Sequence, residues 1–474
     1  MNLDRTNASL AAKRPIKILQ FGEGNFLRAF ANWMIDILNE KSPKFNAGVS
    51  VIQPIDRGLV HMLKAQDGLY HHLIRGIQKG KEINDTRLIS CIDETINPFE
   101  SPEDYFAHAS NNELKIILSN TTEAGIRFED EDLPESGLAN TFPGKLTQLL
   151  KKRFDHFEGN AESGLVFIPC ELIEKNGEKL KAAILQYAEK WSLGDSFIDW
   201  ISNHNYFGNT LVDRIVPGYP KEEIKEIQER IGYDDQLVVA SEVFHLWVIE
   251  GPKEIQKVLP ADEYGLNVKF VDDLTPYRTQ KVRILNGTHT AMVPVGLLAQ
   301  IETVRETVED EITGKFVKSV MYEEIAPTID LPQDGVRAFA DEIMERFKNP
   351  FIRHELKSIS LNSISKFKVR VLPTIKDYIQ ANENAPKRLI FSLACLIKLY
   401  LSDSFQATDD QFILDLFNEW KAANLSNESL AEKILSQKSF WGEDLTSIAS
   451  IQPLLISYLD KIEVEGIKEI LKTF

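Results

Sequence analysis

The chain has 474 residues, which is long for one hydrophobic core, so two domains of roughly 200 to 280 residues each are expected. Hydrophobic residues make up 43% of the chain, enough to bury both cores. The formal net charge of −17 argues against non-specific nucleic-acid binding, which depends on clustered lysine and arginine. An anionic substrate would therefore need a local positive pocket.

Cysteine spacing and the lengths of the apolar runs indicate a soluble protein of the cytoplasm. Cys91, Cys170 and Cys395 are widely spaced and form no CxxC pair, so we expect reduced thiols. The first fifteen residues lack the apolar segment of a secretion signal, and no run reaches the ~18 apolar residues of a membrane span. We expect no metal site, because His71 and His72 are adjacent and no HExxH motif occurs.

The first 275 residues predict an α/β fold. Ile16–Phe21 is a short apolar run that meets a glycine, and a helical pattern follows over residues 25–39, which is the order strand, turn, helix. Strands separated by helical stretches predict a parallel sheet with crossover helices. Further strands are expected at Val49–Ile55, Arg87–Ile92, Leu114–Ser119, Leu165–Pro169, Leu237–Ser241, Phe244–Ile249 and Asn267–Val271, the last as the final strand of the sheet.

After about Tyr277 the patterns become mainly helical. Examples are residues 335–347, 386–401, 409–422 and 430–435. We therefore expect a Rossmann-like dinucleotide-binding domain over residues 1–277 and a mainly helical substrate and catalytic domain over residues 278–474. Catalytic residues are expected in a cleft where the two domains meet.

Two glycines after the first predicted strand point to a dinucleotide. Gly22 and Gly24 leave room for backbone amides and a helix start to receive a pyrophosphate, although Leu27 stands where the common fingerprint has its third glycine. Asp56, just after the second strand, can accept hydrogen bonds from ribose hydroxyls and repel a 2′-phosphate, which favours NAD over NADP. A purely structural role for the glycines and for Asp56, or a 2′-phosphate contact through Arg57, are the alternatives.

The segment KVRILNGTH (residues 281–289) places three chemically useful side chains where an amphipathic helix is expected to begin. Asn286 and His289 are three residues apart and share a helical face, which Lys281 can reach from the first turn. Reducing a ketone creates an alkoxide, which a desolvated lysine can protonate while Asn286 and His289 donate hydrogen bonds to it. The alternative is a capped helix with a core histidine and a surface lysine.

The spacing of these three residues resembles the mannitol dehydrogenase family, the polyol-specific long-chain dehydrogenases. The blocks FGEGNFLRAF, SNTTEAGI, PCELIEKNG, TLVDRIVPGYP and NPFIRHELKSISLNSISKFKVRVLP also occur here in the family's order, over most of the chain. The resemblance implies catalysis without a metal, with Lys281 as the general acid and base. It also implies NAD binding at Gly22, Gly24, Asn25, Phe26, Asp56, Asn120, Thr121, Thr122 and Glu123, of which Thr122 and Glu123 are equally suited to helix capping.

Within the family the chain is most similar to members that reduce D-tagaturonate to D-altronate in hexuronate catabolism. Glu171 and Leu172 stand where mannitol-type members carry Asp-Asn, which argues against mannitol. Glu171 is therefore a candidate substrate contact. The resemblance also places Asp213 in the active site, with a structural salt bridge to Arg214 as the alternative.

The carboxylate of a hexuronate requires a cation in the pocket. Lys366, Lys368 and Arg370 are the candidates; they would share one side of a strand and spread around a helix, and a solvated basic face is the alternative. Other open functions are fructuronate reduction, another polyol or sugar-acid dehydrogenase, a Schiff-base lyase through Lys281, and a non-catalytic sensor. The expected partner is a small sugar acid, with no nucleic acid and no membrane, in a monomer or small homo-oligomer.

Overall fold

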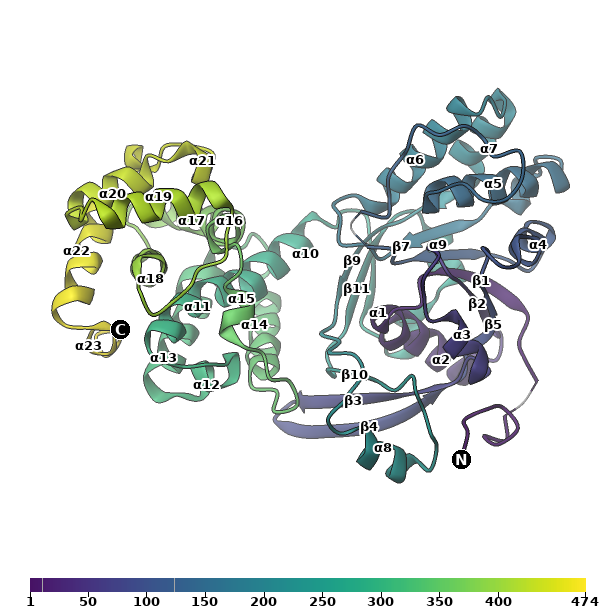
Figure 1. Ribbon diagram of the computed structural model, residues 1–474, viewed down its shortest axis with the longest axis horizontal. Coiled ribbons are helices and arrows are strands. Elements are labelled where there is room, and N and C mark those ends of the chain that lie inside the picture. The colour runs from purple at the N-terminus through teal and green to yellow at the C-terminus, as the bar shows by residue number, and fades with distance from the viewer. Residues whose placement is uncertain (11, 123) are drawn as a thin grey trace. The chain divides into compact units, whose positions relative to one another are not determined.

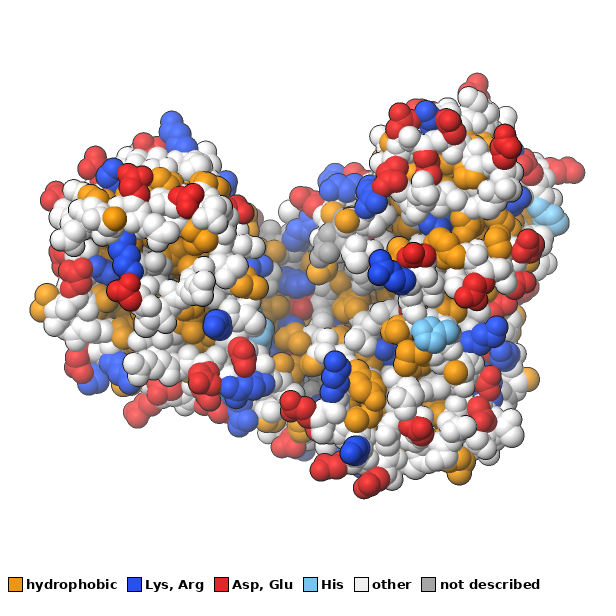
Figure 2. Space-filling view, in the orientation of Figure 1, with side chains coloured by type: hydrophobic (Ala, Val, Ile, Leu, Met, Phe, Trp, Pro, Cys, Tyr) orange, Lys and Arg blue, Asp and Glu red, His pale blue; other side chains and the backbone are white. Residues whose placement is uncertain are grey.

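The computed structural model describes residues 1–10, 12–122 and 124–474 (Figure 1). The chain forms two compact units. The first consists of Met1–Arg75 and Ile83–Leu274, and the second of Gly76–Glu82 and Thr275–Phe474. Acidic and basic side chains are interspersed on the face drawn in Figure 2. Within the described residues, no helix combines the length and the apolar character that crossing a membrane requires.

The first unit is built around a parallel sheet of six strands. Their order is β5-β2-β1-β6-β7-β8, and every neighbouring pair is parallel. Strands that are buried on both faces need nearly continuous apolar runs, and such runs allow these strands to be predicted from the sequence. The strands are β1 (Ile16–Phe21), β2 (Gly48–Ile52), β5 (Ile92–Ile96), β6 (Ile116–Ser119), β7 (Val166–Pro169) and β8 (Tyr206–Phe207).

Helices cover both faces of this sheet. Ile18 packs with Phe30 and Met34 on one face, whereas Leu19 packs with Leu146 and residues of α6 and α7 on the other. The helices of the first unit are α1 (Asn25–Ala29), α2 (Ala31–Lys41), α3 (Val60–Ala65), α4 (Pro102–Ala107), α5 (Phe142–His156), α6 (Asn176–Lys190), α7 (Asp195–His204), α8 (Ile224–Ile231) and α9 (Lys253–Val258). The single helix expected over residues 25–39 is split at Phe30, where φ is −118° and ψ is −81°.

Two three-stranded sheets complete the first unit, and they correct two predictions. The strand at Asn267–Val271 does not close the parallel sheet, because it pairs with β11 in a separate sheet. Arg87–Ile92 is not one strand, because Asp36 accepts hydrogen bonds from the amide and hydroxyl of Ser90 and interrupts the ladder. The strands are β3 (Tyr70–Gln78), β4 (Lys81–Ile89), β9 (Asn209–Asp213), β10 (Val239–Ser241), β11 (Leu246–Glu250) and β12 (Val268–Val271).

The second unit is helical, which confirms the expected fold class. Its buried helix α18 packs against α11, where the Ser392 hydroxyl donates to the Ala291 carbonyl at 2.7 Å. The helices are α10 (Thr275–Gln280), α11 (Thr288–Leu298), α12 (Val304–Glu309), α13 (Glu311–Ser319), α14 (Gln333–Phe347), α15 (Leu356–Ile359), α16 (Ser363–Arg370), α17 (Leu372–Asn382), α18 (Lys387–Leu401), α19 (Gln411–Ala422), α20 (Asn427–Leu435), α21 (Lys438–Trp441), α22 (Ile451–Val464) and α23 (Ile467–Leu471). Lys281–Gly287 and Val320–Ile325 are π-helical.

The tip of the β3–β4 hairpin belongs to the helical unit. The backbone amides of Lys79 and Gly80 donate to the carboxylate of Glu345 on α14, at 3.0 and 2.8 Å. The second unit is therefore assembled from two distant parts of the chain.

Candidate active site

The glycine turn lies at the carboxyl end of β1, in the middle of the parallel sheet. Gly22 has φ of +114°, and a Cβ atom there would lie 2.8 Å from the carbonyl oxygen of Asn120. Both constraints require glycine. Because β1 lies between β2 and β6, the strand order reverses at this point, which is where ligands bind in sheets of this kind.

Gly24 is the N-cap of α1 and faces open space. A Cβ atom there would meet nothing within 4 Å, and no side chain caps the helix. Asn25 and Phe26 support the turn, since Asn25 Oδ1 accepts a hydrogen bond from Arg28 at 2.6 Å and Phe26 stacks on Phe30 at 4.9 Å. The uncapped amides at this helix start are suited to receive a phosphate group.

Glu23, which no sequence motif singles out, connects the turn to the loop after β2. Its buried carboxylate accepts a hydrogen bond from the Leu59 amide at 3.1 Å, and a Cβ atom on Gly58 would lie 2.0 Å from it. Burial raises the pKa of Glu23, although the Leu59 amide acts in the opposite direction. The turn and the loop are thus held as one piece.

Asp56 stands in the same loop with its side chain 77% exposed. Its carboxylate lies 3.8 Å from the Arg57 guanidinium, which is itself 92% exposed. Asp56 lines a cavity of about 420 Å³ together with His61 and Asn97. The carboxylate is therefore accessible to hydroxyl groups of a ligand.

Asn120, Thr121 and Thr122 follow β6 beside the turn. The Asn120 amide donates to the Phe21 carbonyl at 3.0 Å, which joins this segment to the end of β1. Thr122 has φ of +89°, a left-handed conformation that is strained for a β-branched residue. The remaining predicted cofactor residue, Glu123, lies outside the described residues.

Glu171 braces the ends of β6 and β7. Its Oε1 atom accepts hydrogen bonds from the Thr121 amide at 2.9 Å and the Thr121 hydroxyl at 3.0 Å, and its Oε2 atom accepts one from the Ser119 hydroxyl at 3.0 Å. Burial raises the pKa of Glu171, while these hydrogen bonds lower it. Glu171 is 2% exposed and its carboxylate is already engaged by these groups, and a substrate contact through Glu171 stays a prediction.

Asp213 is the last residue of β9 and is buried. The following residue, Arg214, donates to the carbonyl oxygens of Ala29 at 2.7 Å and Glu242 at 3.0 Å, and its guanidinium lies over the Trp33 ring. Burial lowers the pKa of Arg214 to about 9. Arg214 thus anchors the end of β9, and with it the position of Asp213.

Lys281, Asn286 and His289 lie on one long helix of the second unit. The prediction that this helix begins at Lys281 was wrong, because it begins with α10 at Thr275 and continues through the π-helix Lys281–Gly287, here called the π segment, into α11. The backbone remains right-handed helical across both junctions of the π segment. The predicted site is therefore in the middle of a helix.

The hydrogen-bond register of the π segment decides which side chains align. A π-helix is bonded from residue i to i+5, so Lys281 and Asn286 lie one turn apart. In an α-helix the neighbours are three or four residues apart, and these two would not face each other. His289 follows Asn286 by three residues, which places all three on one face.

His289 is a buried, neutral imidazole. Its ring lies 4.4 Å from the Phe347 ring and 5.1 Å from the His354 ring. Burial holds the pKa of His289 well below its usual value, and the positive charges of His354, Arg346 and Arg370 lower it further. Its Nε2 atom is buried and has no hydrogen-bond partner among the described residues.

The three candidate cations lie on α16 and spread around it. Lys366 donates to the Ile359 carbonyl at 2.9 Å, and Lys368 lies beside Gly442 of the neighbouring turn. Arg370 is the one of the three whose charge acts on His289, and its carbonyl oxygen would lie 3.0 Å from a Cβ atom on Gly287. Only Arg370 is therefore placed beside the histidine.

Three residues around His289 were not predicted individually. Arg346 and Phe347 lie at the end of α14, and His354 lies before α15. His354 belongs to the NPFIRH block, so the resemblance pointed to the region, but no spacing rule singles out the residue. Among the described residues, no three His, Cys, Asp or Glu side chains are grouped as metal ligands.

Comparison with known proteins assigns both parts of the chain to one family. Residues 16–262 match the mannitol dehydrogenase Rossmann domain, and residues 273–461 match the mannitol dehydrogenase C-terminal domain. Altronate oxidoreductase of Bacillus subtilis is 45% identical over 461 residues, covering 97% of this chain and 95% of that protein. Altronate oxidoreductase of Phocaeicola vulgatus is 43% identical over 474 residues, covering 98% of each chain. These matches confirm the resemblance drawn from the motifs.

Two solved structures share the fold. D-sorbitol dehydrogenase in substrate-free form has a TM-score of 0.81 at 22% identity, covering 99% of this chain and 100% of that one. Mannitol 2-dehydrogenase of Pseudomonas fluorescens, in a ternary complex with NAD and D-mannitol, has a TM-score of 0.67 at 20% identity, covering 100% and 99%. At these identities the likeness shows the fold alone.

Proposed function

Because the chain belongs to the mannitol dehydrogenase family, we propose that it catalyses the NAD-dependent, reversible reduction of D-tagaturonate to D-altronate. The observation that carries the proposal is the identity of 41–45%, over nearly the full length, to relatives named altronate oxidoreductase. The structural neighbours are named for sorbitol and mannitol, so the fold alone does not separate a polyol from a sugar acid.

The residues of the first unit fit a dinucleotide. The open space at Gly24 and the uncapped start of α1 would hold the pyrophosphate, and Asp56 would accept the ribose hydroxyls. NADH, when bound, supplies the hydride for the reduction. Glu23 keeps the Asp56 loop fixed relative to the glycine turn, so that both parts of the cofactor are held together.

Replacing Asp56 tests the choice of cofactor. Asp56→Ser should lower the ratio of kcat/KM with NADH to kcat/KM with NADPH by about tenfold, because the carboxylate no longer repels the 2′-phosphate. Asp104→Ser, which alters another carboxylate of the same cavity, is the matched control. Equal kcat/KM values with both cofactors in the unmodified enzyme would show that Arg57 governs the pocket instead.

Proton transfer is assigned to Lys281. Its Nζ atom donates a proton to the carbonyl oxygen of tagaturonate as the alkoxide develops, and accepts the proton in the reverse direction. The Asn286 amide donates a hydrogen bond to the same oxygen. His289 offers an N–H from its Nε2 atom, and because burial keeps the pKa low and the ring neutral, it adds no charge.

Arg370 is assigned to the substrate carboxylate. It lies on the His289 side of α16, whereas Lys366 is engaged by the Ile359 carbonyl and Lys368 lies beside Gly442. A charge-assisted hydrogen bond is worth about 1.5 to 3 kcal/mol, or about ten- to a hundredfold in rate or affinity. Tagaturonate should therefore be reduced much faster than fructose, which has no carboxylate.

A panel of tagaturonate, fructuronate and fructose with NADH tests the substrate, in the presence of a chelator that should have no effect. Arg370→Gln should lower kcat/KM for tagaturonate about tenfold or more and leave the value for fructose nearly unchanged, with Lys368→Gln as the control. A higher kcat/KM for fructuronate would make the protein a mannonate oxidoreductase and leave the mechanism intact. A preference for fructose would overturn the carboxylate assignment as well.

A further inference from the structure

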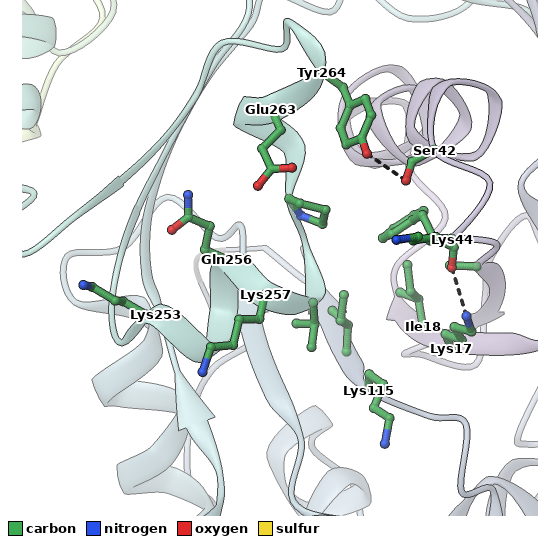
Figure 3. A pocket seen from close by; sticks show the side chains of 15 residues that line it. Lys17, Ile18, Ser42, Lys44, Lys115, Lys253, Gln256, Lys257, Glu263 and Tyr264 are labelled. Atoms are coloured by element: carbon green, nitrogen blue, oxygen red, sulfur yellow. Dashed lines mark hydrogen bonds between the residues drawn. The ribbon is translucent and has the colours of Figure 1, made fainter.

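A second cavity lies in the first unit, at the edge of the parallel sheet opposite the glycine turn. Lys17 and Ile18 at the start of β1 and Lys115 and Ile116 at the start of β6 contribute to it, together with α9 and the loop after α2. The amino ends of the strands line this cavity, whereas the glycine turn follows their carboxyl ends. Its volume is about 680 Å³, within the range of small-molecule sites (Figure 3).

The walls of this cavity are apolar with a polar edge. Ile18, Phe45 and Val258 supply aliphatic and aromatic surface. At one side the Tyr264 hydroxyl donates to the Ser42 hydroxyl at 2.9 Å (Figure 3). A ligand with an apolar or aromatic body fits such a surface better than a bare inorganic ion does.

Positive charge dominates the lining. Of the fifteen lining residues, all within the described part of the chain, one is a carboxylate, Glu263, and five are lysines: Lys17, Lys44, Lys115, Lys253 and Lys257. Figure 3 shows Lys44 and Glu263 on opposite sides of the cavity. This excess of cations stands out in a chain whose net charge is −17.

Three of the five ammonium groups have no hydrogen-bond or ion-pair partner among the residues that the structure describes. Lys17 donates to the Phe45 carbonyl at 2.9 Å, and Lys257 pairs with Glu254 at 3.4 Å. Over the described residues, the side chains of Lys44, Lys115 and Lys253 make neither a hydrogen bond nor an ion pair. Like charges held around one cavity repel one another, and an anion in the cavity relieves that repulsion.

We propose that this cavity binds a phosphorylated organic metabolite, with its apolar body on the Ile18, Phe45 and Val258 surface and its phosphates at Lys44 and Lys115. The site is separate from the dinucleotide site, because it opens at the opposite edge of the sheet. It binds a ligand that is neither the cofactor nor the sugar acid. Its occupancy therefore gives the enzyme a means of responding to another metabolite.

Calorimetric titration with ATP at low salt tests the proposal, with inorganic triphosphate and adenosine as probes of charge and body alone. ATP should bind most tightly, and its binding should weaken as salt is raised. It should persist when NADH is saturating, because the two sites lie at opposite edges of the sheet. Loss of the ATP signal with NADH would show that ATP had occupied the dinucleotide site, and would overturn the proposal.

Charge variants locate the binding. The double variant Lys44→Gln/Lys115→Gln should weaken ATP binding about tenfold or more, whereas Lys433→Gln/Lys461→Gln, with the same change in net charge on the helical unit, should not. Glu263→Gln should tighten ATP binding about fivefold, since it removes a negative charge from the lining of the cavity. A gain in affinity is not expected of a residue with only a structural role.

Thermal melting of each variant checks that it is folded. Absence of binding by both ATP and triphosphate, or unchanged ATP affinity in the Lys44→Gln/Lys115→Gln and Glu263→Gln variants, would overturn the site. Triphosphate binding as tightly as ATP would overturn the ligand class, because the apolar surface would then contribute nothing.

Discussion

The glycine turn and the π segment present chemistry to a ligand in two different ways. The turn offers backbone amides and needs two positions without side chains, Gly22 and Gly24. The π segment offers side chains and needs an unusual hydrogen-bond register to align Lys281 with Asn286. The first requirement is a matter of residue type and is visible in the sequence. The second is a matter of backbone geometry, which the sequence pattern does not show.

The largest effect is expected at the π segment. Lys281→Ala should lower kcat by about 10² to 10⁴, because the proton donor is lost, while NADH affinity stays nearly unchanged. Single-turnover rates and a fluorescence titration with NADH measure the two quantities. Lys433→Ala, on the exposed surface of α20, is the control. A near-normal rate would remove Lys281 from the mechanism.

The two glycines should respond differently to alanine. Gly22→Ala should lower the free energy of unfolding by about 1 to 3 kcal/mol, because φ is +114° and the new Cβ atom meets the Asn120 carbonyl. Gly24→Ala should leave the melting temperature unchanged, since its φ of −63° suits alanine, and should raise the KM for NADH. Equal loss of stability in both variants would contradict a ligand-facing role for Gly24.

The smallest expected effect is a loss of stability at acidic pH. Burial lowers the pKa of His289, so below the usual value of about 6.5 the unfolded chain binds a proton that the folded chain does not. Stability should therefore fall as pH drops below that value, by up to about 1.4 kcal/mol per pH unit, and be unaffected above it. His289→Gln should flatten this dependence in urea unfolding between pH 7.5 and 5, compared with exposed His156→Gln. An unchanged slope would mean that His289 is not buried as a neutral ring.

Local residue patterns predicted most of the fold but few of the side-chain contacts. The apolar run Ile16–Phe21 indicated a buried strand because both its faces are covered, whereas the β3–β4 hairpin, with charged residues along β4, was missed. Glu171 was identified as a site residue, but its partners, Thr121 and Ser119, are distant in sequence and known only from the fold. The same holds for Arg370, because its position beside His289 depends on the orientation of α16 about its own axis.

The hairpin tip Gly76–Glu82 affects how this protein can be divided and synthesised. A fragment that starts at Thr275 lacks the Lys79 and Gly80 amides that donate to Glu345, so one cut between residues 274 and 275 does not release a complete helical unit. On the ribosome the tip emerges long before α14 and must wait for its acceptor. Truncation studies of the helical unit should therefore supply the tip, as a peptide or as a graft, before they judge whether that unit folds alone.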